Sequence, residues 1–321
     1  MKHYLEANHE TVHWGFLSAE INPVLQVSSG DEIEITSVSG PPEVTKNCPF
    51  EVKASLQEIH EKSIRGTLQG GHICTGPIEV QGSKNGDVIE IEILSIELDS
   101  DWAYTGVAPL KGALPDDFNA KQMSYLEIDR YRKIAKTPWN MEVDLDPFFG
   151  LIATAPPMEW GKLSTVPPRR NGGNMDNKEL KVGTTLYLPV FENGAMVSIG
   201  DGHGAQGDGE ICTAAVEMDM RGKFKIINRT DMQITWPIAE NVDYFITMAF
   251  DPDLDECVKI TTREMIKFLS EYCGLTRPDA YTLLSYVGDL RITQVVNGNK
   301  GVHLMIPKKY FHKTFKKITE E

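Results

Sequence analysis

Cysteine is scarce in this sequence, and no two cysteines have the spacing of a metal-binding or redox pair. The chain of 321 residues has five, which are Cys48, Cys74, Cys212, Cys257 and Cys273. An odd number without any Cys-x-x-Cys spacing argues against a disulfide framework and against a cysteine-ligated zinc site. We therefore expect a reduced protein located in the cytoplasm.

Basic residues are too few to balance the acidic ones. The sequence has 32 lysine and arginine residues against 46 aspartate and glutamate residues, which gives a formal net charge of −14. Such a field repels phosphate backbones and anionic membrane surfaces, so we expect binding neither to nucleic acid nor to membranes. A small neutral molecule is admitted without this penalty.

Long apolar runs are missing as well. No segment is long and apolar enough to span a bilayer, and the first residues have no signal-peptide pattern. The hydrophobic fraction of 41% and the charged fraction of 24% are typical of a folded globular protein. The length allows a sizeable core in one large domain or in two ordinary ones.

Motifs of nucleophilic serines do not occur. The sequence has no Gly-x-Ser-x-Gly elbow and no Ser-x-x-Lys pair, which disfavours the serine amidases. Cys74 and Cys212 remain as alternative nucleophiles, for a cysteine-dependent amidase. Each lies among apolar and β-branched residues, an environment that favours a buried, unreactive thiol.

Strand patterns dominate what is present. In Asp31–Thr36 and Gly86–Leu98, apolar and charged residues alternate with period two. More short apolar segments follow, with turn residues between them and no regularly alternating helices. The pattern predicts a mostly β, sandwich-like architecture rather than a doubly wound sheet.

The predicted organisation is a single domain over residues 1–321 that contains two related β units. Its parts are a β unit at 25–100, pocket-forming loops at 101–177, a β unit at 178–250, a helical hairpin at 262–287 and C-terminal strands at 288–307. The relation between the units rests on residues 72–80, HICTGPIEV, which resemble residues 210–218, EICTAAVEM. If these segments face a shared cleft, His72 lies opposite Glu210 and Glu79 opposite Glu217.

The helical hairpin is predicted from its capping residues. Thr261 or Thr262 is the expected N-cap of the first helix, and Gly274 follows its end. Pro278 lies in the first turn of the second helix, and Gly288 follows that helix. We expect this hairpin to be architectural.

The segment GDGHGAQGDGE at 200–210 carries the most chemistry. Gly202, Gly204 and Gly207 match the Gly-x-Gly-x-x-Gly pattern of dinucleotide-binding loops. That interpretation is disfavoured, because the flanking acidic residues would repel a pyrophosphate and no long amphipathic helix follows.

A metal site fits the same segment better. Asp201 and His203 are two residues apart, so on an extended strand both side chains point to one face. Carboxylate and imidazole are ordinary zinc ligands, and Glu217 is the best third ligand if the chain turns back as an adjacent strand. The structural alternative is a tight turn in which Asp201 and His203 only cap backbone groups.

Several long segments resemble the acetamidase/formamidase family, and the similarity runs across nearly the whole chain. The most specific are PFFGLIATAPP at 147–157, the block from GGNMD at 172–176 to GAMVSIGDGHGAQGDGE at 194–210, and GDLRITQVVNGNKGVHLMIP at 288–307. The resemblance implies a mostly β enzyme that hydrolyses short aliphatic amides, formamide or acetamide, to carboxylate and ammonia, with metal ions in its site. The segments 151–160 and Lys111–Met141 depart from the family pattern, and both bear on the shape of the pocket.

From these observations we predict a metal-assisted hydrolase. The ion, zinc in the first place and calcium as an alternative, is held by Asp201, His203 and Glu217. Glu210 or Asp208 is the general base.

Further residues are predicted around this centre. His72 completes the metal sphere or binds the oxyanion. The expected substrate contacts are Thr75, Asn174 and Gln206, and Asp176 is expected to line the same cleft. The aromatic residues expected to restrict the acyl group to one or two carbons are Trp102, Tyr104, Phe148 and Phe149.

Two further expectations concern partners. A binding protein without catalysis, stabilised by calcium in the acidic loop, is an alternative to the enzyme, although His203 suits calcium poorly. A homodimer is expected because exposed sheet edges need covering.

Overall fold

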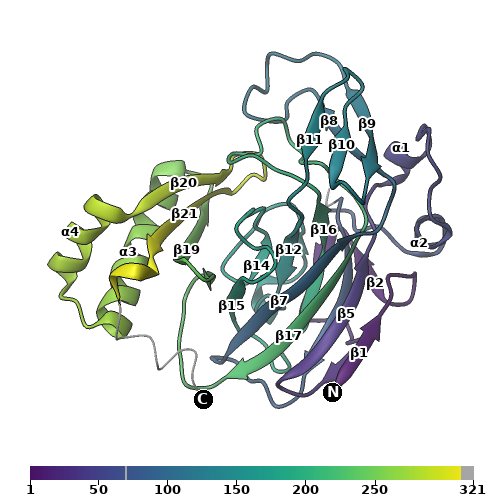
Figure 1. Ribbon diagram of the computed structural model, residues 1–321. Coiled ribbons are helices and arrows are strands. Elements are labelled where there is room, and N and C mark those ends of the chain that lie inside the picture. The colour runs from purple at the N-terminus through teal and green to yellow at the C-terminus, as the bar shows by residue number, and fades with distance from the viewer. Residues whose placement is uncertain (69–70, 312–321) are drawn as a thin grey trace.

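Two facing β-sheets form the centre of the structure, and a helical hairpin extends from one end (Figure 1). The computed structural model describes residues 1–68 and 71–311, so residues 312–321 of the predicted domain lie outside this description. The mostly β, sandwich-like class with a C-terminal helical hairpin is confirmed. Among the described residues, no helix has the length and hydropathy to cross a membrane.

The larger sheet has nine strands and contains most of the alternating segments of the sequence. In spatial order they are β1 (Lys2–Leu5), β5 (Asp31–Ser37), β17 (Met220–Arg229), β7 (Val88–Leu98), β15 (Thr185–Pro189), β18 (Ile238–Glu240), β19 (Tyr244–Asp251), β21 (Lys300–Pro307) and β20 (Asp289–Gln294). Strands β5 and β7 coincide with the two segments of clearest period-two alternation.

The smaller sheet carries the site. In spatial order its strands are β14 (Gly172–Asn174), β12 (Phe148–Ala153), β16 (Val197–His203), β6 (Ile73–Val80) and β2 (Val12–Trp14), with β4 (Leu25–Val27) also paired to β6. A four-stranded sheet comprises β11 (Glu142–Asp144), β10 (Ile134–Lys136), β9 (Gln122–Asp129) and β8 (Trp102–Val107). The last sheet pairs β13 (Leu163–Ser164) with β3 (Phe16–Leu17).

The main core lies between the two large sheets. Alternate residues of each strand point inward, as in Ile33 of β5, Ile91 of β7 and Ile199 of β16, and all three are fully buried. Burying this apolar surface is the main stabilising contribution and fixes the register of the strands that carry the site.

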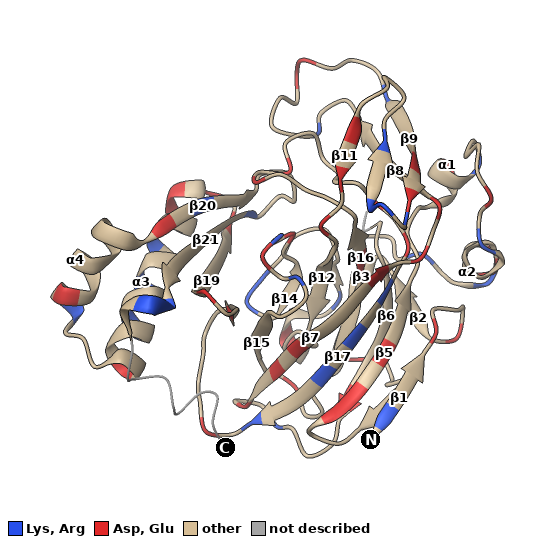
Figure 2. Cartoon of the chain, in the orientation of Figure 1, with Lys and Arg blue, Asp and Glu red and all other residues tan. Residues whose placement is uncertain are grey.

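The outer face of the larger sheet carries charges of alternating sign. Lys223 of β17 pairs with Glu32 of β5, and Lys225 pairs with Glu92 of β7. Figure 2 shows this as basic residues along β17 between acidic residues of β5 and β7. Such cross-strand pairs suit a face exposed to water, which explains the alternation seen in the sequence.

The strands of the two predicted β units alternate within both sheets. Strand β17 lies between β5 and β7, and β16 pairs with β6. Residues 25–100 and 178–250 therefore share one core rather than each forming a separate sheet. The turns of the two similar segments do not align as expected: Glu79 accepts a hydrogen bond from Gln26, near the Val197 end of β16, whereas Glu217 lies at its His203 end.

The C-terminal hairpin comprises α3 (Leu254–Cys273) and α4 (Arg277–Val287), and its end caps at Gly274 and Gly288 are as predicted. The predicted start of α3 is wrong, because Asp253 is the N-cap and accepts from the backbone NH of Asp255. Thr261 instead bonds Thr247 of β19 through its hydroxyl.

Short helices complete the structure near the pocket and between strands. They are α1 (Pro42–Thr45), α2 (Ala54–Lys62) and the 3-10 turns at Met158–Trp160 and Lys308–Tyr310. Of these, α1 faces β8 and β9 across the cavity described below.

Candidate functional site

Strand β16 brings two of the predicted site residues into the interior. Asp201 and His203 are both buried at its C-terminal end, between the flanking strands β12 and β6. A Cβ atom at Gly200 would lie 2.5 Å from the carbonyl oxygen of Ile73, and one at Gly202 would lie 2.5 Å from that of Met218. Glycine at these two positions therefore allows the neighbouring backbones to approach the strand.

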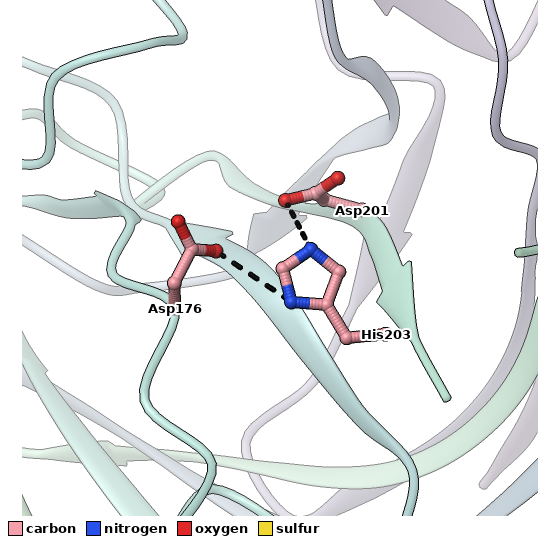
Figure 3. A group of neighbouring side chains, drawn as sticks. All are labelled: Asp176, Asp201 and His203. Atoms are coloured by element: carbon pink, nitrogen blue, oxygen red, sulfur yellow. Dashed lines mark ion pairs between the residues drawn. The ribbon is translucent and has the colours of Figure 1, made fainter. Parts of the chain in front are cut away.

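The imidazole of His203 is the centre of a cluster of carboxylates (Figure 3). Its Nε2 lies 3.2 Å from Oδ2 of Asp201 and 3.2 Å from Oε1 of Glu217. Its Nδ1 lies 3.9 Å from Oδ1 of Asp176. Both nitrogens of the ring therefore face negative charge, and the cluster has more acidic than basic groups.

Glu217 reaches His203 because the chain reverses after β16. The backbone NH of Gly204 donates to the carbonyl oxygen of Val216 at 2.7 Å, and Val216 donates to Ala205 at 3.0 Å. Glu217 then forms an isolated β-bridge with His203. The chain therefore turns back beside β16, which was the condition for Glu217 to lie next to His203.

Asp176 belongs to the cluster, although the sequence indicated only that it lines the cleft. It follows β14 with a φ of 49°, and its backbone carbonyl accepts a hydrogen bond from Nε2 of Gln206 at 2.7 Å. The other end of the same amide, Oε1 of Gln206, lies 3.0 Å from Nδ1 of His203. Gln206 therefore ties Asp176 to His203.

Glu210 completes the cluster from the loop after β16. Its side chain is buried, and its Oε2 atom has no hydrogen-bond partner among the described residues. One group of potential metal ligands joins His203, Glu210 and Glu217, with ligand atoms within 4.8 Å of one another. A second group, Asp176, Asp201 and His203, overlaps it at the imidazole.

Burial shifts the protonation of these groups. Loss of hydration raises the pKa of Asp176 to about 6 and raises the pKa of Glu210 well above its usual range. It also raises the pKa of Glu217. Negative charge at this density is costly to bury without a cation.

The attraction between His203 and its neighbouring carboxylates favours their charged forms, which burial disfavours. Burial by itself lowers the pKa of His203, but the charges of Glu217 and Asp201 raise it well above its usual value. Burial likewise opposes ionisation of Asp201, yet the nearby His203 holds the pKa of Asp201 below its usual range. A single imidazolium compensates only part of the negative charge in the cluster.

The residues present fit a divalent cation. Oδ1 of Asp176 and Oε2 of Glu210 are buried without hydrogen-bond partners in the described part of the chain. A Cβ atom at Gly150 would lie 2.4 Å from Oδ1 of Asp176 and 2.7 Å from Oδ2 of Asp201, so glycine there leaves space for both carboxylates. Carboxylate oxygens around one imidazole nitrogen form a donor set that zinc accepts.

A cavity of about 250 Å³ gives access to the cluster, and Asp201, Glu217 and His72 line it. Nδ1 of His72 lies 2.9 Å from the hydroxyl of Thr165, which fixes the orientation of the ring. Its Nε2 lies 3.9 Å from Oδ2 of Asp201. His72 is therefore at the junction of the cavity and the carboxylates.

Asp208, the alternative base, is not brought into the cluster. Its side chain is 34% exposed, and one oxygen lies 3.2 Å from Nζ of Lys178. It lines a second cavity, of about 570 Å³, together with Glu210. Of the two carboxylates, Glu210 and not Asp208 therefore belongs to the cluster around His203.

The three predicted substrate contacts do not line the first cavity. Thr75 is fully buried and donates its hydroxyl proton to the carbonyl oxygen of Thr36 at 2.7 Å. Asn174 donates from Nδ2 to the carbonyl oxygen of Val166. Gln206 lines the second cavity instead, and its amide joins Asp176 to His203 as described above.

The predicted aromatic walls are largely wrong. Of the four rings, only Tyr104 lines the first cavity. Phe148 and Phe149 are fully buried, and the ring of Phe148 packs edge-on against His203 with 5.1 Å between centroids. Trp102 is buried as well and donates from Nε1 to the carbonyl oxygen of Glu51. Phe148 and Phe149 are neighbours on β12 and point to opposite faces, and both faces are covered: Phe148 contacts His203 and Phe149 contacts Phe224.

Neither cysteine near the site has the surroundings of a nucleophile. Cys74 is fully buried on β6, and burial raises the pKa of its thiol far above the usual range. Cys212 is exposed, and its Sγ donates to the carbonyl oxygen of Ala214 at 3.6 Å. The cysteine-dependent alternative is therefore disfavoured.

The glycine pattern does not form a dinucleotide-binding loop. After Gly207 the chain forms turns and then strand β17, and the next helix among the described residues is α3. Among the described residues, the glycines are therefore not followed by the helix N-terminus whose dipole and free NH groups bind a pyrophosphate in such loops.

Comparison with known proteins agrees with these features. The family described as Acetamidase/Formamidase matches residues 3–162 and 161–313. An acetamidase of Mycolicibacterium smegmatis is 32% identical over 206 residues, which cover 46% of this chain and 51% of that protein. A formamidase of Methylophilus methylotrophus is 31% identical over 199 residues, covering 46% of this chain and 49% of that protein.

A solved structure extends the similarity to the whole fold. The crystal structure of an acetamidase from Bacillus halodurans superposes with a TM-score of 0.83 and 29% identity, covering 97% of this chain and 99% of that one. The alignments with the two curated relatives span about half of each of them. Because the family match extends over nearly all of its residues, the chain belongs to the acetamidase/formamidase family.

Proposed function

We propose that this protein hydrolyses the C–N bond of primary amides and releases a carboxylate and ammonia. The observation that carries the proposal is a buried group of four carboxylates around one imidazole, reached from a cavity that admits a small neutral molecule. The names of its relatives, acetamidase and formamidase, support the same reaction.

We assign a divalent cation to this group, with Asp201, His203 and Glu217 as ligands and Asp176 as a fourth candidate. When bound, the cation supplies a Lewis acid for the amide carbonyl and lowers the pKa of a water molecule. Zinc is favoured over calcium because one donor is an imidazole nitrogen. Phe148 supports that imidazole from the side by its edge-on contact.

Glu210 is the proposed proton carrier. Its Oε2 is buried without a hydrogen-bond partner among the described residues, so it is free to accept a proton from the attacking water. Its raised pKa, caused first by burial, lets the protonated carboxyl persist until the C–N bond breaks. The proton then passes to the nitrogen, which leaves as ammonia.

His72 is the proposed contact to the substrate oxygen. Its ring lines the cavity, and the bond between Nδ1 and Thr165 leaves Nε2 directed to the region of Asp201. A proton on Nε2 can then donate to the carbonyl oxygen as negative charge develops on it. This assignment uses His72 for the oxyanion and not as a metal ligand.

Replacement of the proposed proton carrier tests the function directly. Glu210→Gln keeps the size of the side chain and removes its ability to carry a proton, and we expect ammonia release from acetamide to fall about 100-fold or more. Asp208→Asn is the matched control from the same loop, and it should retain most of the activity. Equal losses in both variants would contradict the role given to Glu210.

The oligomeric state and the location remain predictions. Strands β1 and β20 are the two ends of the nine-stranded sheet, so pairing through either edge would produce the expected homodimer. Sedimentation equilibrium measures this directly. The cytoplasm remains the expected location.

A further inference from the structure

The cavity beside the cluster has two walls of different origin. One wall is the segment that contains α1, with Gly40 and Val44, and the other is the inward face of β8 and β9, with Tyr104, Gly106 and Met123. The walls bring mostly apolar groups to the cavity, with Ser39, Lys121 and Thr213 as polar exceptions, and the cluster brings acidic ones. A substrate would therefore meet reacting groups at one end and apolar surface along its sides.

Hydrogen bonds hold the two walls at a fixed separation. The hydroxyl of Tyr125 on β9 donates to the carbonyl oxygen of Val44 at 2.7 Å. The hydroxyls of Tyr104 and Ser39 lie 3.2 Å apart. Because these bonds bridge the walls, the space between them belongs to the folded protein and not to a loop that must first rearrange.

Glycine at position 106 leaves room for the side chain of Met123. A Cβ atom there would lie 2.8 Å from Sδ of Met123, so the side chain of Met123 occupies the room that a larger residue would need. The register of β8 and β9 places Gly106 directly opposite Met123. Met123 therefore sets the width of the cavity on this side.

The volume decides which amides fill the cavity. An apolar protein cavity of about 150 Å³ holds a benzene molecule. The cavity here has about 250 Å³ and so exceeds that volume. Formamide and acetamide leave most of it unfilled and bury almost none of its apolar surface. They therefore gain little binding energy from its walls.

We propose that the preferred substrates are primary amides whose acyl group is apolar and about the size of a benzene ring. This inference rests on the proposed amide hydrolysis and adds the substrate class. The amide group lies at the carboxylate cluster, and the acyl group lies between Val44 and Met123. The reaction itself is unchanged: water attacks the carbonyl carbon, the C–N bond breaks and ammonia leaves.

Ammonia release from a graded series of amides tests the substrate class. The series is acetamide, butyramide, hexanamide and phenylacetamide, assayed with the zinc-loaded full chain. We expect kcat/KM to rise about fourfold for each added methylene until the cavity is filled. A maximum at acetamide, with a decline along the series, would overturn the inference and leave amide hydrolysis intact. No ammonia from any member would instead overturn the proposed function.

Variants of the cavity wall test whether the acyl group binds in this cavity or whether the protein merely prefers apolar molecules in general. Met123→Trp narrows the space, and we expect the ratio of kcat/KM for hexanamide to that for acetamide to fall at least about tenfold. Gln122→Trp is the matched control, because the same bulky ring is added at an exposed neighbour that does not line the cavity. An unchanged ratio in Met123→Trp would contradict the inference.

Met123→Ala provides a test that does not depend on a bulky side chain being accommodated. It enlarges the cavity on the same side, and we expect the substrate preference to move toward longer or branched amides. A fall in kcat/KM by the same factor for every amide, without a shift in preference, would show that Met123 only supports the fold.

Discussion

Asn297 donates a hydrogen bond from Nδ2 to Oδ2 of Asp176, although 121 positions separate the two residues in the chain. The same amide donates to the backbone carbonyl of Asn174 at 3.3 Å. Asn297 is buried in the turn between β20 and β21. The C-terminal strands therefore reach the carboxylate cluster and orient one of its members.

Loss of this contact should weaken the metal site more than the fold. In Asn297→Leu, Oδ2 of Asp176 loses its donor, and we expect the affinity for zinc to fall about 10- to 100-fold, as is usual for groups that orient metal ligands. Competition with a chromophoric chelator measures it. Asn299→Leu, in the same turn, is the control, because Asn299 donates to Pro168 and not to the cluster. Unchanged zinc affinity in Asn297→Leu would remove Asp176 from the proposed ligands.

Gly150 offers a test of the space at the centre of the cluster. In Gly150→Ala the new methyl group would meet Asp176 and Asp201 at less than 3 Å, so the carboxylates must move apart. We expect zinc binding and ammonia release to fall about 100-fold, with a stability loss of about 1–3 kcal/mol from overpacking. Gly207→Ala is the control, since no atom lies within 4 Å of a Cβ there. Full activity in Gly150→Ala would contradict the described geometry.

The sequence predicted the parts of the site that are local in the chain. Asp201 and His203 share a face because a strand has period two, and Glu217 follows because the intervening glycines allow a reversal. The place of Asp176 beside His203 was missed because nothing in the spacing links residue 176 to 203 or to Asn297. The first link arises from the pairing of β12 with β14 and β16, and the second from the turn between β20 and β21, which brings Asn297 to Asp176.

Contacts between distant parts of the chain were also missed in the prediction of the fold. Alternation predicted β5 and β7 but not that β17 lies between them, because strand order depends on distant pairings. The aromatic rings were expected to restrict the acyl group, yet burial of large apolar area draws Phe148 and Phe149 into the interior. The start of α3 was misplaced because two capping signals occur in one helix, and Asp253 is the one that is used.

Acid should destabilise the protein through His13. Burial lowers the pKa of this histidine from 6.5 to about 4, and its neutral ring bonds Phe16 and Ser198. The unfolded chain therefore binds a proton that the folded chain excludes. This contribution is fully present above pH 6.5 and declines as pH falls toward 4, by up to about 3 kcal/mol.

Urea unfolding at pH 7 and pH 4.5 measures this dependence. We expect His13→Gln to lose less stability than the wild type over that interval, because its side chain does not titrate. An identical loss in both proteins would show that His13 is not responsible.

The two cysteines near the site should be dispensable for the chemistry. We expect Cys74→Ala and Cys212→Ser to retain ammonia release within about threefold, with a small loss of stability in Cys74→Ala from the cavity left in the core. The combined variant should also retain activity. Abolished turnover in either single variant, with the fold preserved, would favour a thiol nucleophile.

We expect the carboxylate cluster to support hydrolysis only with a divalent cation bound. The most direct measurement is ammonia release from acetamide and hexanamide before and after dialysis against a strong chelator, with zinc then added back and counted per chain. We predict that activity disappears with the cation and returns as zinc occupancy is restored, and that Asp201→Ala and His203→Ala neither bind zinc nor release ammonia. Full activity in a protein shown to contain no metal would contradict the account.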